Sequence, residues 1–300
     1  MHAAKNGDLS PVSATISRDR LFDRCPLGCN DDLQTSAIIL TEGPLLRCAM
    51  CSHLLSSCTR GQYELALKKW DTSSGTTPEA RSAARFQQVT ERRLRYALRL
   101  LGRLSPPPLR LLDVGCSSGA LLAVAAKLGF SPSGVEIASK AAETAQRAGF
   151  EVFCGLLHEA RFADEAFNVI TAFELIEHVT APVFLLSECH RILKPEGVLI
   201  INTPNAASWT AGVMRESWDG FHLSSMGGHV SFFSPRSFAK LAGRCGFRVE
   251  RLETRRVRFA ESHHVSPIVY RALKVLGEVL SIPASLLDKG HDMLAFLRKM

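Results

Sequence analysis

From residue 109 onward, short apolar runs alternate with segments that repeat apolar residues at helical spacing. Runs such as LRLLDV and FNVITAF have the length and composition of buried strands, whereas GALLAVAAKLG and SPRSFAKLAGRCG indicate helices. Because strands that alternate with helices form βα units, the pattern predicts an α/β fold with a mainly parallel sheet. The expected strands span residues 109–115, 130–138, 150–155, 167–173, 197–204 and 247–259, and the expected helices span residues 119–129, 139–149, 181–193 and 234–246.

Three of the expected helices end on the dipeptide Gly-Phe, at Gly129, Gly149 and Gly246. Glycine adopts the left-handed conformation that commonly ends a helix, because it has no Cβ to clash. The phenylalanine that follows can enter the sheet as the first apolar residue of a strand. The dipeptides therefore predict three junctions between a helix and the next strand.

The chain before residue 109 has a different pattern. Residues 71–80 (DTSSGTTPEA) are polar and indicate a linker or the start of a helix. An amphipathic helix is expected after them, ending at the SPPP sequence of residues 105–108. Its apolar residues recur at helical spacing: Phe86, Val89, Leu94, Leu98 and Leu101.

Cysteines crowd the N-terminal part in two close pairs, CPLGC and CAMC. A structural zinc ion needs four ligands in a tetrahedron, and two such pairs on adjacent hairpins supply them. The ligands would be Cys25, Cys29, Cys48 and Cys51, joined through short strands in TSAIIL and GPLLRC. The first pair is one residue longer than the usual C-x2-C spacing, so free thiols in a loop are the alternative.

Composition sets broad limits on function. The chain is 46% hydrophobic, no apolar run reaches the length of a membrane span, and the N-terminus lacks the apolar core of a secretory signal. We therefore expect a cytoplasmic globular protein. The net charge of +7 permits an anionic partner, but the arginine-rich stretches 92–95 and 251–258 are expected to be solvated faces. No nucleic-acid motif accompanies them, so nucleic acid is not the expected partner.

The stretch RLLDVGCSSGALLAVAAKLGF combines a strand, a glycine turn and a helix. Parallel sheets bind ligands outside the carboxyl ends of their strands, which is where Asp113, Gly115 and Gly119 fall. Gly115 would permit the tight turn, and Gly119 would let a ligand approach the helix. The Gly-Lys-Ser/Thr of a phosphate-binding loop is absent, and D-x-G-x-x-x-G differs from the dinucleotide spacing. Glu136 ends the next expected strand, where a carboxylate can accept hydrogen bonds from both hydroxyls of a ribose.

Four segments in this order resemble the motifs of class I S-adenosylmethionine-dependent methyltransferases: LLDVGCSSG, GVEIA, FNVITAFELIEHV and LKPEGVLIINTPN. Asn168 stands where the third of these motifs usually has Asp. The resemblance covers about residues 80–300. It implies a Rossmann-like seven-stranded sheet with an antiparallel last strand, for which HDMLAFLRKM is suited. The cysteine cluster also resembles the zinc-ribbon appendage of one branch of this family.

The resemblance implies roles for the residues that match the motifs. Asp113, Gly115 and Gly119 would line the methionine part of S-adenosylmethionine, and Glu136 would bind its ribose. Leu156 and Leu157 would lie near its adenine. Phe173 and Glu174 would face its sulfonium.

The expected domains follow from these assignments. They are a disordered N-terminus (1–20), a zinc-ribbon-like module (21–60), a linker with the amphipathic helix (61–108) and a class I methyltransferase domain (109–300).

Candidate catalytic residues follow the fourth expected strand and lie in a long connection. FELIEHV places Glu174, Glu177 and His178 together, and it resembles ubiquinone-type O-methyltransferases, in which the matching residues are metal ligands. The alternative is a structural role in the loop. His229 lies in residues 203–233, a segment long enough to be a lid over the substrate. It is the candidate base on the substrate side, with ordering of the loop as its alternative.

Residues 265–289 are expected to form a helical insertion, marked by Val269, Leu273, Leu276 and Leu280. Packing on the domain is the simplest expectation. Covering the substrate pocket, dimerisation and peripheral contact with a membrane are the alternatives.

Three classes of function remain open. The first is methylation of a small-molecule acceptor, chiefly at oxygen, such as a sugar, lipid-linked glycan, quinone or secondary metabolite. The second is methylation of RNA or protein, and the third is a cofactor-binding domain without catalytic activity. The sequence identifies neither the acceptor nor the oligomeric state.

Overall fold

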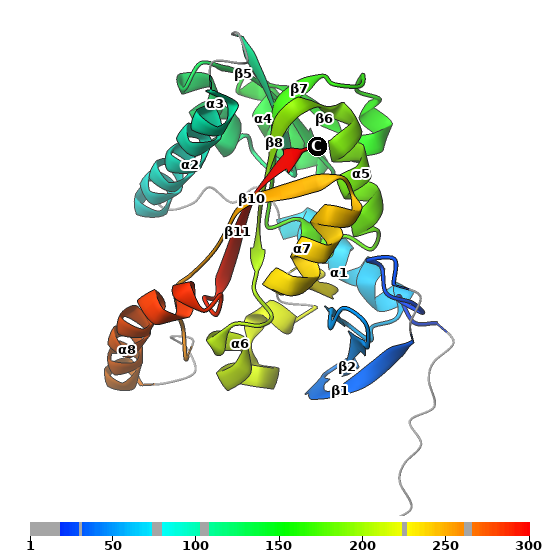
Figure 1. The fold of residues 1–300 in the computed structure, drawn as a ribbon, viewed down its shortest axis with the longest axis vertical. Coiled ribbons are helices and arrows are strands. Elements are labelled where there is room, and N and C mark those ends of the chain that lie inside the picture. Colours follow the sequence, from blue (N-terminus) through cyan, green and yellow to red (C-terminus); the bar gives the residue numbers. More distant parts are fainter. Residues whose placement is uncertain (1–18, 30–31, 74–79, 103–107, 224–226, 261–265) are drawn as a thin grey trace, which may run out of the picture.

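The computed structural model describes residues 19–29, 32–73, 80–102, 108–223, 227–260 and 266–300. Its centre is a seven-stranded sheet of order β10-β11-β8-β7-β4-β5-β6, seen in Figure 1. The first five strands of this sheet along the chain are parallel, and β11 is antiparallel to both of its neighbours. The strands are β4 (Leu109–Val114), β5 (Phe130–Glu136), β6 (Glu151–Cys154), β7 (Phe167–Phe173), β8 (Leu193–Pro204), β10 (Phe247–Arg255) and β11 (Asp292–Lys299). The predicted fold class is confirmed.

Helices cover both faces of this sheet. In Figure 1, α2 and α3 lie on one side and α5 and α7 on the other. Alternate strand residues point to opposite faces, so Leu111 packs with α2, α3 and α4 while Leu112 packs with α5 and α7. The helices of these two layers are α2 (Ala80–Leu101), α3 (Ala120–Lys127), α4 (Ser139–Arg147), α5 (Pro182–Ile192) and α7 (Pro235–Arg244).

The Gly-Phe junctions form as predicted. Gly129, Gly149 and Gly246 have φ angles of 85°, 90° and 79°, the left-handed region that only glycine enters without strain. Phe130 and Phe247 then begin β5 and β10, and Phe150 immediately precedes β6.

The N-terminal part forms a second, four-stranded sheet of order β1-β2-β3-β9. Its strands are β1 (Leu33–Leu40), β2 (Gly43–Cys48), β3 (Leu54–Leu55) and β9 (Ser231–Phe232). The hairpin of β1 and β2 was expected, but β9 comes from the long connection after β8. Helix α1 (Arg60–Ser73), which follows β3, was also not predicted.

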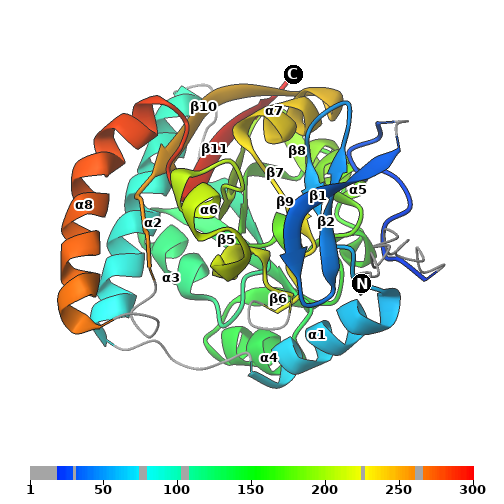
Figure 2. The same ribbon diagram turned by 90° about the horizontal axis from the view of Figure 1, so that it is seen from below.

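The remaining elements lie mostly at the carboxyl edge of the large sheet. The connection of residues 203–233, here called the lid segment, contains α6 (Trp209–Met214), η4 (Arg215–Ser217) and η5 (Asp219–Phe221) before β9. Two short 3-10 helices, η2 (Leu157–Ala160) and η3 (Ile176–His178), follow β6 and β7. Helix α8 (Pro267–Leu286) joins β10 to β11. In Figure 1 α8, α6 and the β1–β2 hairpin all lie at the lower end, and Figure 2 views the molecule from that end.

Several sequence expectations lie outside the described residues: residues 1–18 of the disordered N-terminus, most of the DTSSGTTPEA linker, and the prolines at 106 and 107. The division of the chain into domains stays a prediction. Within the described residues, no helix is both long and apolar enough to cross a membrane.

Close packing of β5 against the glycine turn supplies a test of the fold. A Cβ on Gly134 would lie 2.5 Å from Cys116 Sγ and 3.0 Å from Cys116 Cβ, so the buried thiol fills the space that this glycine leaves. We expect Gly134→Ala to lower the free energy of unfolding by about 1–3 kcal/mol, because the core has no room for the methyl group. Gly243→Ala is the matched control in α7, where an added Cβ meets nothing within 4 Å. Thermal or urea unfolding of both variants measures the difference, and equal stabilities would contradict the packing described.

Candidate functional site

The carboxyl ends of β4, β5 and β7 bring together three of the predicted residues. Asp113 is buried at the end of β4, and the Thr171 hydroxyl of β7 donates a hydrogen bond of 2.6 Å to its Oδ1. Burial raises the pKa of Asp113 to about 7, opposed by this hydrogen bond and assisted by the nearby charge of Glu136. The strand end therefore holds an acidic group whose ionised form gains from a nearby cation.

Glu136 ends β5 and is buried beside the glycine turn. Its Oε2 accepts a hydrogen bond of 2.8 Å from the Ser117 amide, and its Oε1 accepts one of 2.8 Å from the Ala138 amide. The carboxylate thus fixes the turn after β4 and the start of α4. Each carboxylate oxygen has two acceptor positions, so both retain one for ligand hydroxyls.

The two glycines of the turn have left-handed backbones, with φ 78° at Gly115 and 85° at Gly119. A Cβ on Gly119 would lie 3.1 Å from atoms of both Ala145 and Phe150, which pack beneath the turn. The missing side chain of Gly119 thus also permits α3 to pack on the α4 region, and its expected role toward a ligand stays a prediction. A Cβ on Gly115 would contact Leu175 at 3.4 Å, on the η3 side of the turn.

The two leucines after β6 differ in exposure. Leu156 is 46% exposed, whereas Leu157 is buried in the main core cluster. The Leu156 amide donates a hydrogen bond of 2.7 Å to Glu159 Oε2 at the start of η2. Only Leu156 therefore offers a side chain to a ligand that lies outside this edge of the sheet.

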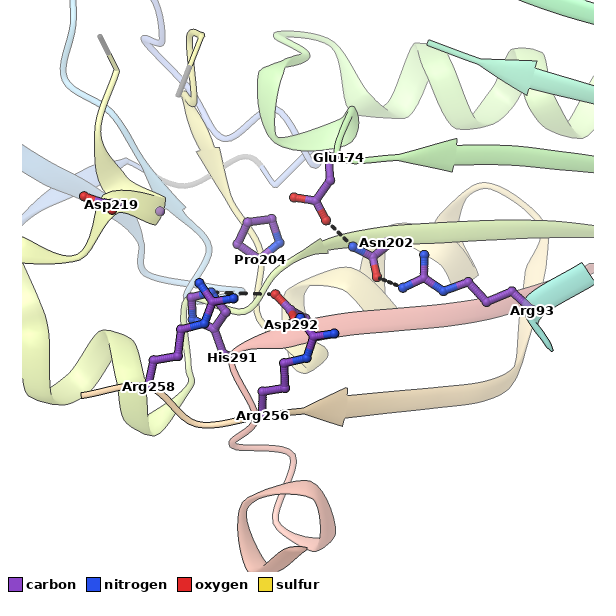
Figure 3. A pocket seen from close by; sticks show the side chains of 10 residues that line it. Arg93, Glu174, Asn202, Pro204, Asp219, Arg256, Arg258, His291 and Asp292 are labelled. Atoms are coloured by element: carbon purple, nitrogen blue, oxygen red, sulfur yellow. Dashed lines mark hydrogen bonds and ion pairs between the residues drawn. The ribbon is translucent and has the colours of Figure 1, made fainter. Parts of the chain in front are cut away.

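Glu174 follows β7 in a left-handed conformation (φ 50°), which is sparsely populated by residues other than glycine. Its Oε1 accepts a hydrogen bond from the Asn202 amide of β8, and Asn202 Oδ1 accepts one of 2.7 Å from the Arg93 guanidinium (Figure 3). Arg93 also stacks over Phe173, with its guanidinium carbon 4.7 Å from the ring centroid. Burial and the charge of Asp292 raise the pKa of Glu174 to about 7, against the opposing effects of Asn202 and Arg93.

A polar cavity of about 330 Å³ opens beside Glu174, at the carboxyl ends of β7 and β8. Figure 3 shows side chains of the surrounding elements directed into it. Its lining includes three arginines, three carboxylates and a histidine, and this composition suits a polar ligand. The lining residues are Arg93, Glu174, Asn202, Pro204, Asp219, Gly220, Arg256, Arg258, His291 and Asp292.

Of these residues, only Glu174 was predicted from the sequence as a site residue. The interpretation of residues 251–258 as a solvated face was incomplete, because Arg256 and Arg258 are exposed and also line the cavity. Arg256 lies 3.5 Å from Asp292. The buried Nδ1 atom of His291 finds no hydrogen-bond partner in the part of the chain that the structure describes. These residues come from separate elements, and no local motif marked them.

Beside the cavity, η3 and the lid segment bring Glu177, His178 and His229 together, with one ligand atom from each within 4.8 Å of the others. His229 Nδ1 donates to the Gly220 carbonyl and His178 Nδ1 donates to the Gly227 carbonyl, each at 3.0 Å. Burial lowers the pKa of both imidazoles, to about 3 for His178. Both rings are therefore neutral, with Nε2 as an acceptor.

Two buried atoms of this cluster face each other without a hydrogen bond. Glu177 Oε2 accepts a hydrogen bond of 2.9 Å from Thr203, but the buried Oε1 has no hydrogen-bond partner among the described residues. Oε1 lies 3.9 Å from His229 Nε2, which is also an acceptor. Burial raises the pKa of Glu177 well above its usual range, so proton binding or a cation would stabilise this arrangement. Neither histidine lines the cavity.

The four predicted cysteines also come together. Cys25, Cys29, Cys48 and Cys51 are buried, and their sulfur atoms all lie within 4.8 Å of one another. Cys25 and Cys51 Sγ are 3.6 Å apart, close to the ~3.8 Å edge of a tetrahedral zinc–thiolate site. Gly28 accommodates the longer first pair with φ 75°, and the Arg244 guanidinium of α7 donates to the Leu27 carbonyl.

Hydrogen bonds connect the cysteine module to the cluster beside the cavity. Strand β3 pairs with β9, the Ser56 amide donates to the Val230 carbonyl, and the Val230 amide donates to the Glu177 carbonyl. The Tyr63 hydroxyl of α1 donates to the His178 carbonyl at 2.7 Å. His53, buried next to the second cysteine pair, hydrogen-bonds Ser231 at 2.9 Å. The N-terminal module thus supports the backbone that carries both histidines.

Comparisons with known proteins agree with this arrangement. A family model described as "Methyltransferase domain" matches residues 85–252. The chain is 28% identical over 203 residues to a ubiquinone biosynthesis O-methyltransferase of Thiobacillus denitrificans, covering 63% of this chain and 82% of that protein. It is 29% identical over 150 residues to the enzyme of the same name from Leptothrix cholodnii, covering 47% of this chain and 60% of that protein.

A solved structure of geranyl diphosphate C-methyltransferase from Streptomyces coelicolor A3(2), in complex with S-adenosyl-L-homocysteine, shares the fold. It has a TM-score of 0.52 and 15% identity, and the match covers 80% of this chain and 98% of that one. With more than half of its length matched by the family model, the chain belongs to the methyltransferase domain family and is an S-adenosylmethionine-dependent methyltransferase.

Proposed function

We propose that this enzyme methylates an oxygen atom of a small-molecule acceptor that binds in the cavity beside Glu174. The observation that carries the proposal is the position of this cavity: it opens at the end of β7, next to the residues that the family motifs assign to the sulfonium side. Its volume of about 330 Å³ suits a small molecule or the head of a larger one. The ubiquinone O-methyltransferase relatives support oxygen as the acceptor atom and a quinol-like compound as the substrate.

The described residues fit S-adenosylmethionine as methyl donor. Asp113 and Glu174 are buried carboxyl groups with raised pKa values, and a sulfonium or ammonium nearby would favour their ionised forms. Glu136 offers its two remaining acceptor positions to the ribose, and Leu156 offers apolar surface to the base. The donor carries its methyl group already activated on a positively charged sulfur, so the protein chiefly positions the reactants.

Glu174 is the residue that we assign to the acceptor's proton. In the transfer, the acceptor oxygen forms the new bond to carbon, the carbon–sulfur electron pair passes to sulfur, and the hydroxyl proton must leave. The Glu174 carboxylate lines the cavity, and a pKa of about 7 suits a base at neutral pH. His229 was the candidate base, but its two ring nitrogens face Gly220 and Glu177, so we assign it to the cluster instead.

The first prediction concerns binding of the methyl donor. We expect Glu136→Ala to weaken S-adenosylmethionine binding by at least about tenfold, because the ribose loses a charged acceptor. Glu136→Gln, which keeps one oxygen toward the turn, should show an intermediate loss. Glu143→Ala, an exposed carboxylate of α4, is the matched control. Calorimetric titration measures all three, and an unchanged affinity in Glu136→Ala would remove this residue from the site.

The second prediction concerns the acceptor and its proton. Purified enzyme with S-adenosylmethionine is offered a hydroxyquinol, a sugar, an alkylamine and an RNA oligonucleotide, with mass spectrometry of the products. We expect methylation of the hydroxyquinol at oxygen, with a rate that rises with pH as Glu174 ionises, because only the ionised carboxylate accepts a proton. The pKa of Glu174, about 7 without ligand, should fall when the sulfonium is bound. Glu174→Gln should lower the rate by about 100-fold and remove this pH dependence, whereas the exposed control Glu143→Gln should not.

Three outcomes would contradict the proposal. Methylation of the RNA or of the amine alone would assign the enzyme to another acceptor class. Donor binding without any methylated product would favour a non-catalytic domain. A pH profile that Glu174→Gln leaves unchanged would assign the proton to another group.

Two metal sites also fit the residues present. Four buried thiols at tetrahedral spacing suit a structural zinc ion, which would hold the two cysteine pairs together. The orphaned Oε1 of Glu177 and the two neutral imidazoles suit a divalent cation, and the Nδ1–H bonds to backbone carbonyls would orient the rings. A cation there would supply positive charge near the cavity.

The third prediction concerns the metal content of the purified protein. Protein purified without added metal should contain about one zinc per chain, and Cys48→Ser should lose it, because three thiolates bind zinc more weakly than four. A second divalent ion should be removable by a mild chelator and absent from His229→Ala, while zinc remains. The exposed control His158→Ala should match the wild type. Less than half an equivalent of zinc would contradict the first site, and equal metal content in His229→Ala would contradict the second.

A cytoplasmic location and a small-molecule rather than nucleic-acid partner stay predictions.

A further inference from the structure

Helix α8 presents a row of large aliphatic side chains to solvent. Five of them are between 61% and 82% exposed. With 3.6 residues per turn they fall within a sector of about 60°. We call this row the α8 stripe: Ile268, Val275, Val279, Ile282 and Leu286.

On the opposite face of α8, the fully buried residues are small. Gly277 and Ala284 are buried, and a Cβ on Gly277 would lie only 2.4 Å from the Val257 carbonyl oxygen. Val269 and Leu276, two of the residues expected to mark the packed face, are each 46% exposed. The helix thus packs closely through its small residues and directs its bulk outward. Such a distribution is unfavourable in water alone, because the five side chains of the α8 stripe do not gain the free energy that burial would supply.

We propose that the α8 stripe docks on the surface of a lipid bilayer that contains anionic lipids. An amphipathic helix on such a surface inserts its apolar row to the level of the acyl boundary and keeps basic residues near the headgroups. Arg271 and Lys274 are exposed on one flank of the stripe. Arg256 and Arg258 are exposed on the chain that leads into α8.

Charge favours a membrane over a second copy of the chain. Among the described residues, the exposed acids close to the stripe are Glu278 and Asp288, against the four basic residues just named, of which Arg256 lies 3.5 Å from Asp292. The whole chain carries a net charge of +7. Two copies that met through their stripes would bring like charges together, whereas an anionic lipid surface is attracted to them. The stripe also runs for about 27 Å along the helix, a length that can lie flat on a bilayer.

The position of α8 gives the docking a consequence for the substrate, and this step rests on the proposed function. Arg256 and Arg258 line the cavity and lie eleven and nine residues before the first residue of α8. In Figures 1 and 2, α8 lies at the end of the molecule that carries α6 of the lid segment. A bilayer against the stripe would therefore lie near the cavity, and an acceptor with a membrane-embedded tail could place its polar head there.

The test uses the full chain and vesicle flotation, with no methyl acceptor present. The vesicles are phosphatidylcholine alone, or phosphatidylcholine with about one quarter phosphatidylglycerol. We expect wild-type protein to float with the anionic vesicles, and Val279→Ser/Ile282→Ser to bind them at least about tenfold more weakly. Ile39→Ser/Leu65→Ser is the matched control, since both side chains are more than half exposed on other elements. It should bind as the wild type does.

Calorimetry with S-adenosylmethionine and light scattering complete the test. All variants should keep the wild-type affinity for the donor, which shows that they are folded, and should be monomeric. Absence of wild-type binding to anionic vesicles would overturn the proposal, and so would equal binding by Val279→Ser/Ile282→Ser. A wild-type dimer that this double variant dissociates would assign the stripe to a second copy of the chain. Because no acceptor is used, a failed methylation assay leaves this result unaffected.

Discussion

The short pairing of β3 with β9 is the constraint on which the candidate site depends most directly. Leu54 and Leu55 hold Ser231 and Phe232 in an antiparallel ladder, and this fixes the backbone two residues after His229. The hydrogen bonds continue from Ser56 through Val230 to the carbonyl of Glu177. A two-residue ladder is weak by itself, so the geometry of the cluster relies on the cysteine module that anchors β3. Zinc would therefore act on the site through the backbone, without contact with either substrate.

Electrostatics explains why several acids can be buried at this edge of the sheet. Burial raises the pKa of Asp113, Glu174 and Glu177, which means that ionisation of each is disfavoured in the described protein. Burial of such groups lowers the stability of the fold unless a proton or a nearby positive charge compensates. A donor that carries a sulfonium and an ammonium offers compensating positive charge. The same desolvation raises the pKa of Glu174 to about 7. One physical cause thus supports both donor binding and proton acceptance.

The sequence predicted the parts of the structure that are set by local pattern. The alternation of strands and helices, the Gly-Phe junctions and the cysteine pairs each rest on residues within one segment. Helix α1 was missed because RGQYELALKKWDTS has a weak apolar face, and β3 and β9 are too short to show a period. The cavity was missed for another reason: Arg93 and Asn202 come from α2 and β8, His291 directly precedes β11, and only the fold brings them together.

Helix α8 shows where periodicity alone misleads. Apolar residues occur on nearly every side of this helix, so the spacing of Val269, Leu273, Leu276 and Leu280 could not tell which face is packed. The small residues Gly277 and Ala284 decide it, because they let the helix axis approach the Val257 backbone. Close approach through small residues leaves the side chains of the α8 stripe mostly in solvent. The apolar stripe is thus a consequence of how α8 packs, and a lipid surface of opposite charge is the environment that would remove it from water.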